Sequence, residues 1–293
     1  MRNFDEVTIT DAVLERVQNA PDPRVRQISE ALVRHLHGFV REIEPTFEEW
    51  QAGIDFLTRV GKLCDANRQE FILLSDSLGV SMLVDAINHR LPQGATETTV
   101  LGPFYVSDPP ERPLGADISE GTEGEPLFVS GTVTTADGKP IANAIVDTWH
   151  SDDDGYYDVQ HLDETGGFAM RARFRTDEKG RFHFWTIKPA AYPIPNDGPV
   201  GEMLAAQGRH PWRPAHVHFM IDAPACVKLV THVFEQGDEY LDSDAVFGVK
   251  DSLIHRFERC EPGTAPDGQP MNRPYYHLQY DFTLAEAAQS RAA

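Results

Sequence analysis

The sequence predicts a mixed, mainly β protein, in which an α-helical N-terminal region precedes an antiparallel β-sandwich domain. Two observations support this fold class. Through about residue 92, apolar residues recur three or four positions apart, as they do on one face of a helix. From about residue 100, short alternating runs are separated by Asp, Gly and Pro, which is typical of strands joined by turns. We therefore expect a helical region at residues 1–99 and a β-sandwich domain at residues 100–293.

The helices can be placed from their apolar stripes and their end signals. One helix follows Pro23, and a second begins at Thr46, where Glu49 completes a capping box. A third segment runs from Asn67 to a stop at Gly79, and a fourth runs from about Ser81 to Arg90. The stripe of the first helix consists of Val25, Ile28, Leu32, Leu36, Phe39 and Ile43. Such stripes need apolar partners, so the region either shares a core with the β part or serves as a dimerisation element.

The β part is expected to hold many short strands. Turn sequences such as Asp177-Glu178-Lys179-Gly180 separate them. Long loops at 150–167 and 188–214 are expected to be functional, because loops of this length are uncommon inside a compact domain. The expected strands are Leu127–Thr135, Ala144–Trp149, Phe168–Thr176, Arg181–Ile187, Ala215–Ile221, Val227–Phe234 and Tyr275–Phe282.

Composition excludes several classes of partner. The formal net charge is -20, from 46 acidic and 26 basic residues, which argues against nucleic-acid or anionic-membrane surfaces. No apolar run approaches the ~20 residues that span a bilayer, and the N-terminus lacks the apolar core of a signal peptide. The three cysteines, Cys64, Cys226 and Cys260, suggest free thiols in a reducing cytoplasm. We expect a cytoplasmic protein without membrane insertion.

Two histidines in one expected strand form a candidate metal site. Side chains two positions apart in a strand point the same way, so His216 and His218 can bind one ion. The intervening Val217, together with Phe219, should be buried. Histidine pairs at this spacing also occur by chance on exposed strands, so the pair alone is a modest signal.

Two tyrosines in loop-like sequence strengthen the signal and narrow the metal. Tyr157 and Tyr192 lie where no core aromatic is needed. A phenolate is a hard anionic oxygen donor, and two of them favour iron(III) over iron(II). A ferric centre of this kind would activate an electron-rich organic substrate, and a catechol-type diol fits. A zinc hydrolase and a non-catalytic β-sandwich binding module are the alternatives from other classes.

Five runs of the chain, in order, resemble the intradiol ring-cleavage dioxygenases: Trp149-His150, Gly155-Tyr156-Tyr157, Ala191-Tyr192, Gly208-Arg209-His210 and Arg213-Pro214-Ala215-His216-Val217-His218-Phe219. The stretch 101–105 is also similar, and residues 192–199 and 210–213 look most like the hydroxyquinol branch of the family. The resemblance implies ring cleavage of hydroxyquinol by O2, with catechol or chlorocatechol as the alternative substrate.

The same resemblance implies the site residues. One non-haem iron(III) per subunit would be held by Tyr157, Tyr192, His216 and His218, and Tyr192 would be displaced when the diol chelates. Arg213 would stabilise negative charge developing on the ring. His232 stands where catechol enzymes of the family carry a glutamine, so it is a further catalytic candidate. Tyr156 competes with Tyr157 for the metal, and family spacing selects Tyr157.

The resemblance also implies a substrate pocket and partners. Asp76 is the most informative pocket candidate, because a carboxylate can accept a hydrogen bond from the extra hydroxyl of hydroxyquinol. In this family the helical region forms a homodimer interface and can hold a phospholipid, so both are candidate partners. The pocket candidates are Leu73, Asp76, Val100, Leu101, Gly102, Pro103, Phe104, Ile194, Pro195, Arg213 and Val246.

Overall fold

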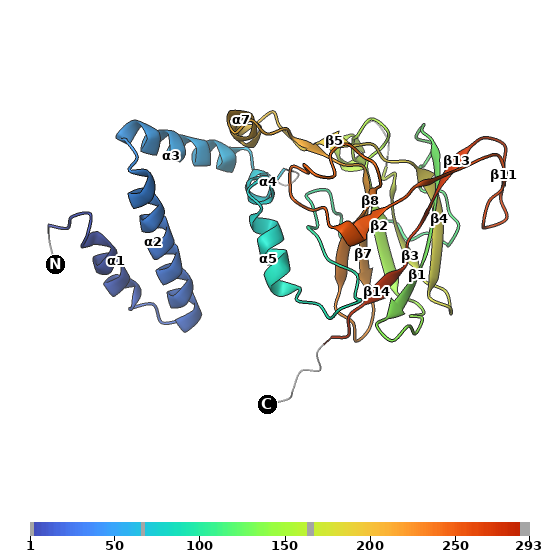
Figure 1. Cartoon of the computed structure of the whole chain (residues 1–293), viewed down its shortest axis with the longest axis horizontal. Helices are drawn as coiled ribbons and strands as arrows, with labels where there is room; N and C mark the ends of the chain where they lie inside the picture. The colour runs from blue at the N-terminus through green and yellow to red at the C-terminus, as the bar shows by residue number, and fades with distance from the viewer. Residues whose placement is uncertain (1–2, 66–67, 163–166, 288–293) are drawn as a thin grey trace. The chain divides into compact units, whose positions relative to one another are not determined.

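The computed structural model describes residues 3–65, 68–162 and 167–287. The chain divides into two compact units, Met1–Arg59 and Val60–Ala293. The expected boundary between residues 99 and 100 therefore falls inside the second unit. Helices α4 and α5 and all the described strands belong to that unit (Figure 1).

The helices begin and end at local sequence signals. The Asp22 side chain accepts hydrogen bonds from the first backbone N–H groups of α2, and Pro23 occupies its first turn. The expected capping box opens α3: Thr46 accepts from the Glu49 N–H, and Glu49 accepts from the Thr46 N–H. The described helices are α1 (Ile9–Val17), α2 (Pro23–Ile43), α3 (Phe47–Lys62), α4 (Glu70–Ser77), α5 (Val80–Asn88) and α7 (Pro199–Ala206), with 3-10 turns η1 (Asp158–Gln160) and η2 (Asp251–Leu253).

The apolar stripes of α2 and α3 are largely exposed in the single chain, apart from Val60 near the end of α3. No residue of α2 is buried, and Phe47 and Trp50 on α3 are largely exposed. The stripes thus predict the helices correctly, but their side chains are not packed into an apolar core of the unit Met1–Arg59. Within the described residues, no helix is both long enough and apolar enough to cross a membrane.

Within the described residues the strands form two five-stranded sheets and two short hairpin-like pairs (Figure 1). In the first sheet β10, β13, β1 and β14 follow in that order, with β4 also beside β1; the second has the order β3-β2-β7-β8-β9. Strands β5 and β6 pair, as do β11 and β12. The strands are β1 (Pro126–Thr135), β2 (Ile145–Trp149), β3 (Arg171–Arg175), β4 (Arg181–Ile187), β5 (Tyr192–Pro193), β6 (Trp212–Arg213), β7 (His216–Asp222), β8 (Leu229–Glu235), β9 (Ile254–His255), β10 (Glu258–Cys260), β11 (Gly263–Thr264), β12 (Pro270–Met271), β13 (Tyr275–Gln279) and β14 (Phe282–Leu284).

One apolar core lies between the two sheets. Leu127 and Phe184 come from the first sheet, and Phe174, Val217 and Phe219 come from the second. All five side chains are buried, which confirms the inward orientation expected for Val217 and Phe219. Two sheets packed on a shared core make a β-sandwich, as the sequence predicts.

The strand pairing differs from expectation in two respects. Strand β1 runs parallel to β13 and β14, and β8 runs parallel to β9, so the sheets are mixed rather than wholly antiparallel. The expected strand Tyr275–Phe282 is broken into β13 and β14. At the break, the Asp281 carboxylate accepts hydrogen bonds from the backbone and the hydroxyl of Thr132, both at 2.8 Å. A side chain therefore takes the place of a backbone acceptor at that point of the sheet.

Candidate active site

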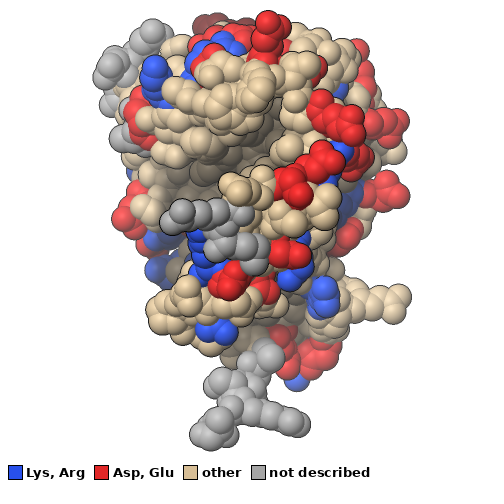
Figure 2. Space-filling model, turned by 90° about the vertical axis from the view of Figure 1, so that its left-hand side faces the viewer, with Lys and Arg blue, Asp and Glu red and all other residues tan. Residues whose placement is uncertain are grey.

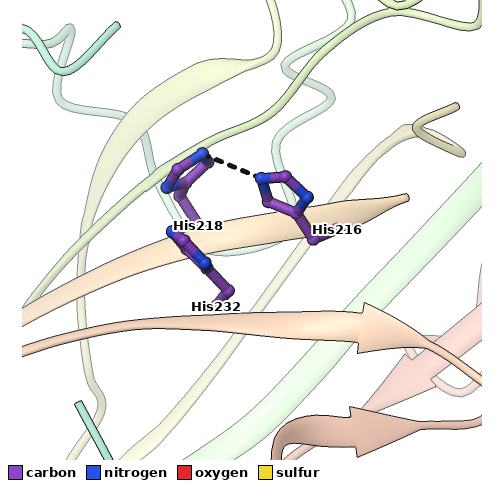
Figure 3. Close-up of side chains that lie close together, drawn as sticks. All are labelled: His216, His218 and His232. Atoms are coloured by element: carbon purple, nitrogen blue, oxygen red, sulfur yellow. Dashed lines mark hydrogen bonds between the residues drawn. The ribbon is translucent and has the colours of Figure 1, made fainter. Parts of the chain in front are cut away.

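Three buried histidines meet on neighbouring strands of the second sheet. His216 and His218 alternate along β7 and point the same way, and His232 on β8 faces His218 across the pair (Figure 3). The two Nε2 atoms of His216 and His218 are 3.1 Å apart. Suitable ligand atoms of all three residues lie within 4.8 Å of one another. The expected two-histidine pair is therefore part of a larger cluster.

Both predicted tyrosines reach the same cluster, Tyr157 from the residue before η1 and Tyr192 from the short strand β5. The Tyr157 hydroxyl lies 2.9 Å from His218 Nε2 and 3.5 Å from His216 Nε2. The Tyr192 hydroxyl is 3.4 Å from that of Tyr157. Tyr156, the neighbour in sequence, is half exposed and contacts His161 instead. The structure thus brings Tyr157, Tyr192, His216 and His218 together and leaves Tyr156 outside.

The loop backbone is shaped to admit Tyr192. Gly155 has a φ of +88°, and a Cβ at this position would approach the Tyr192 Cβ to 2.7 Å. Only glycine meets both requirements without strain. On the other side, β5 pairs with β6, which places Tyr192 directly opposite Arg213. The Gly155-Tyr156-Tyr157 sequence therefore positions one tyrosine and makes room for the other.

The four oxygen and nitrogen atoms are spaced as ligands of one ion. Donor atoms bound at about 2.0–2.1 Å from a single metal ion lie about 2.9–3.4 Å apart. The contacts of 2.9, 3.1 and 3.4 Å among Tyr157, Tyr192, His216 and His218 match that spacing, and the Tyr157 hydroxyl lies slightly farther, at 3.5 Å, from His216 Nε2. His216 donates its Nδ1–H to the Pro214 carbonyl at 2.7 Å, so its Nε2 lone pair faces the cluster. The residues present fit a transition-metal ion.

Burial decides the protonation states in the cluster. Burial lowers the pKa values of His216, His218 and His232 well below 6.5, so these imidazoles are neutral and able to act as ligands. Burial, followed by the neighbouring Tyr192, raises the pKa of Tyr157 well above 10. A cation bound here must therefore displace the Tyr157 proton, which a strongly Lewis-acidic ion does best.

The third histidine holds its place through Thr99. The Thr99 hydroxyl lies 3.0 Å from His232 Nδ1. Among the described residues, His232 Nε2 and His218 Nδ1 are buried without a hydrogen-bond partner. The ring of His218 is instead held by stacking on Trp149, at 4.6 Å between centroids, and by close approach to Gly102. A polar atom left open in a buried cluster marks a place for a ligand or substrate group.

Arg213 is a buried cation at the edge of the cluster. Its Nη1 lies 3.3 Å from His216 Nε2 and 3.4 Å from the Tyr192 hydroxyl. An ion pair with Asp244 holds its other side, at 2.9 Å from Nε to Oδ1. Burial alone would lower the pKa of Arg213, but Asp244 and the two tyrosines raise it overall, so the guanidinium is charged.

The predicted pocket residues come from three parts of the chain. On α4, Leu73 and Asp76 are buried, and burial raises the pKa of Asp76, while Arg213 acts in the opposite sense. Phe104 stacks on Tyr157 at 4.4 Å. Val100, Ile194 and Val246 are buried, whereas Leu101 and Pro103 are exposed and Gly102 and Pro195 are partly exposed.

Comparison with known proteins identifies the family. A family model described as "Dioxygenase" matches residues 100–286, and one described as "Catechol dioxygenase N terminus" matches residues 22–96. The chain is 53% identical to a 6-chlorohydroxyquinol 1,2-dioxygenase of Cupriavidus pinatubonensis, over 97% of this chain and 99% of that protein. It is 49% identical to a hydroxyquinol 1,2-dioxygenase of a Rhizobium species, over 96% of each. The chain belongs to the intradiol ring-cleavage dioxygenases.

Solved structures agree with this assignment. The crystal structure of a hydroxyquinol 1,2-dioxygenase from Pseudomonas putida matches with a TM-score of 0.89 and 50% identity, covering 96% of this chain and 99% of that one. A catechol 1,2-dioxygenase from an Acinetobacter species matches with a TM-score of 0.83 and 30% identity, covering 98% and 94%. The family, the β-sandwich fold class and the enzyme class expected from the sequence are confirmed, and the non-catalytic binding module and the zinc hydrolase are wrong.

Sequence reasoning missed the residues that support this dioxygenase site. Asp244 and Thr99, which hold Arg213 and His232, are distant in sequence from the residues they contact. Asp158 forms a buried bidentate pair with Arg171 directly after Tyr157. These three pairs of residues form through tertiary contacts, so no local sequence pattern predicts them. Trp149, which stacks on His218, lies in the run Trp149-His150 that resembles the family.

Proposed function

We propose that this intradiol dioxygenase opens hydroxyquinol (1,2,4-trihydroxybenzene) between its 1- and 2-hydroxyl groups. Both atoms of O2 enter the product, 3-hydroxy-cis,cis-muconate, which tautomerises to maleylacetate. The choice of hydroxyquinol over catechol rests on how similar the chain is to relatives of each kind. Proteins named as hydroxyquinol or 6-chlorohydroxyquinol 1,2-dioxygenases are 47–53% identical to this chain, whereas a catechol 1,2-dioxygenase of Candida albicans is 35% identical.

An iron(III) ion would be held by Tyr157, Tyr192, His216 and His218. Two phenolates and two neutral imidazoles provide hard anionic and borderline donors that suit the ferric ion. The ion would supply a chelating centre for the two adjacent hydroxyls and make the ring nucleophilic toward O2. The surrounding side chains exclude water: each of the four residues is at least 96% buried in the chain.

Arg213 and Tyr192 would handle charge and protons at the reacting diol. The Tyr192 oxygen lies 3.4 Å from Arg213 Nη1 and would accept a proton from the incoming diol on leaving the ion. The fixed guanidinium then faces the ring as negative charge develops on it, without exchanging a proton. His232, whose Nε2 is buried without a hydrogen-bond partner among the described residues, would donate to or accept from an oxygen on the reacting diol.

The pocket on α4 would select the third hydroxyl. Asp76 is buried on α4; burial raises its pKa, and the charges of Arg213 and Asp244 also affect it. Its carboxylate would pair with the 4-hydroxyl of hydroxyquinol. The apolar pocket candidates, such as Leu73, Val100, Phe104, Ile194 and Val246, would supply the walls that hold the ring.

The expected partners follow the same proposal. The exposed apolar stripes of α2 and α3 would form a homodimer interface, and a phospholipid is the second candidate occupant of that surface. On the face shown in Figure 2, acidic and basic side chains are interleaved with broad uncharged areas, and no basic patch for a nucleic acid stands out. We place the enzyme in the cytoplasm.

Oxygen uptake tests the substrate proposal directly. Purified protein is assayed with hydroxyquinol, catechol and 4-chlorocatechol side by side, and bound metal is measured by elemental analysis. We expect the highest kcat/KM with hydroxyquinol and about one iron per subunit. A higher kcat/KM with catechol would assign the chain to the catechol branch, and zinc in place of iron would contradict the proposed centre.

Replacement of Asp76 tests the specificity residue. The Asp76→Ala variant should narrow the preference for hydroxyquinol over catechol by about 10-fold or more, because the 4-hydroxyl loses a buried partner. Asp85→Ala removes another buried carboxylate of the helical segment, whose partners are Thr98 and His89, and should leave the ratio unchanged. An unchanged ratio of specificity constants in Asp76→Ala would refute the role of Asp76.

A further inference from the structure

The segment Asp244–Gly248 is folded around the guanidinium of Arg213. The Asp244 carboxylate accepts from Arg213 Nε at 2.9 Å and from Nη2 at 3.3 Å, a two-point contact that fixes the guanidinium plane. Both side chains are about 98% buried. This pairing is a fixed, water-excluded contact rather than a surface ion pair.

Asp244 is itself held by the backbone of its own turn. The N–H of Val246 donates to one carboxylate oxygen at 3.3 Å, and the N–H of Gly248 donates to the other at 2.8 Å. Phe247 between them has a φ of +60°, a conformation that a bulky residue adopts only where the surroundings impose it. The strained turn directs two N–H groups at one carboxylate.

Gly248 completes the fit on the side of the arginine. A Cβ at this position would lie 3.1 Å from Arg213 Nη2 and 3.2 Å from an Asp244 carboxylate oxygen. At these distances the ion pair would have to shift by a few tenths of an ångström. The absence of a side chain at residue 248 therefore spares the ion pair this crowding.

The anchored side of the guanidinium leaves its other edge facing the reactive cluster. Nη1 points at the Tyr192 hydroxyl and His216 Nε2, at 3.4 and 3.3 Å, and Nη2 lies 3.5 Å from His232 Nδ1. Without Asp244, the guanidinium would lose the two-point contact that fixes its plane and would be free to turn away from the cluster.

We propose that Asp244 is a positioning residue, which holds Arg213 toward Tyr192 and His216. The inference rests on the proposed function, because it assigns Arg213 a role in the ring-cleavage step. Asp244 does not touch the reacting atoms and acts through the arginine. Its replacement should therefore affect the chemical step much more than substrate binding or metal content.

The Asp244→Asn variant is the main test. Asparagine keeps an acceptor for the turn but loses the charge that orients the guanidinium. We expect kcat with hydroxyquinol to fall about 10- to 100-fold, with KM changed less than about threefold, because the lost interaction strengthens in the transition state. Iron content should be unchanged. Gly248→Ala, which crowds the same ion pair from the opposite side, should give the same separation of kcat from KM.

A double-mutant cycle separates positioning from simple loss of structure. In an Arg213→Ala background, Asp244→Asn should cause no further fall in kcat, because the residue has nothing left to position. The matched control is Asp147→Asn on β2, which disrupts the part-buried two-point ion pair with Arg173 on β3. It should lower the melting temperature while keeping kcat within about twofold of wild type.

The outcomes distinguish the inference from the proposed function. Additive effects of Asp244→Asn and Arg213→Ala, or an equal fall in kcat for Asp147→Asn, would overturn the positioning role alone. Wild-type kcat in Arg213→Ala would remove the catalytic role proposed for the arginine and the inference with it. Loss of iron in Asp244→Asn would also count against it, because a positioning role predicts a loaded centre.

Discussion

At the scale of single residues, adjacent tyrosines have different surroundings. Tyr157 is 1% exposed and contacts His218 Nε2, whereas Tyr156 is 49% exposed and packs edge-on against His161. The 3-10 turn that follows fixes this difference, because Gln160 accepts a hydrogen bond from the Tyr157 N–H at 2.8 Å. The backbone thus places the Tyr157 side chain in the buried cluster and the Tyr156 side chain at the surface.

Substitution of each tyrosine by phenylalanine tests the assignment. Tyr157→Phe removes one of four proposed ligand atoms and should remove the Tyr157 contribution to the visible phenolate-to-iron absorption, with a 10-fold or greater loss of iron affinity. Tyr156→Phe serves as the matched control and should retain both the absorption and the iron. Loss of absorption in Tyr156→Phe, with retention in Tyr157→Phe, would reverse the choice of ligand.

His150 is a buried neutral histidine that gives the fold a pH dependence. Its ring nitrogens contact the Ser151 carbonyl and the Thr186 hydroxyl. Burial lowers its pKa from 6.5 to about 4, partly offset by the hydrogen bond to Ser151. Between these values the unfolded chain takes up a proton and the folded chain does not, so the free energy of unfolding falls as the pH falls from 6.5 toward 4.

The His150→Gln variant measures that contribution. The residue accounts for about 3 kcal/mol of the acid destabilisation, from a shift of about 2.5 pKa units. The variant should be less stable than wild type at pH 7 but should lose less stability on acidification. Urea unfolding at pH 7 and at several values down to pH 4 provides the measurement. Equal losses in the two proteins over that window would contradict the assignment.

At the scale of elements, the sequence predicts long periodic segments well and pairing poorly. Strand β4 has the predicted limits, Arg181–Ile187, because its alternation is regular and turn residues flank it. Helix α7 was missed inside an expected loop. Its first turn is stabilised from far away, since Glu70 on α4 accepts a hydrogen bond from the Val200 N–H at 3.3 Å. A contact between residues 130 positions apart leaves no local signal.

The break between β13 and β14 also depends on a contact between residues distant in the sequence, and the importance of that contact can be tested. Asp281 replaces a backbone acceptor for Thr132, so Asp281→Ala should leave the Thr132 N–H without its partner. We expect a loss of about 1–2 kcal/mol in the free energy of unfolding. The exposed Asp242, outside both sheets, provides the control and should change stability by less than about 0.5 kcal/mol when replaced by alanine. A loss in Asp281→Ala no larger than that of the control would mean that the sheet does not depend on this joint.

At the scale of the whole molecule, every candidate site residue lies in the unit Val60–Ala293. The strand carrying His216 and His218 was predictable from alternation alone, and the loops carrying Tyr157 and Tyr192 from their length and resemblance. The convergence of these segments was predictable only through the family likeness, since it depends on the packing of two sheets. Asp244 could not be predicted from the sequence, because its contact with Arg213 depends on that packing and belongs to no motif.

The helices of the unit Met1–Arg59 make a separate prediction about assembly. Leu32 and Leu36 on α2 are 63% and 54% exposed in a single chain, which is unfavourable for an apolar stripe. If a second copy covers this surface, Leu32→Glu/Leu36→Glu should convert the dimer to a monomer, measured by light scattering after gel filtration. The control Arg34→Glu, an exposed residue of the same helix, should remain dimeric.

Because the candidate catalytic residues lie outside this unit, the monomer should retain kcat per subunit within about threefold. A dimer that survives the double substitution would place the subunit interface elsewhere, and phospholipid extracted from the wild type in stoichiometric amount would show that lipid covers part of the stripe.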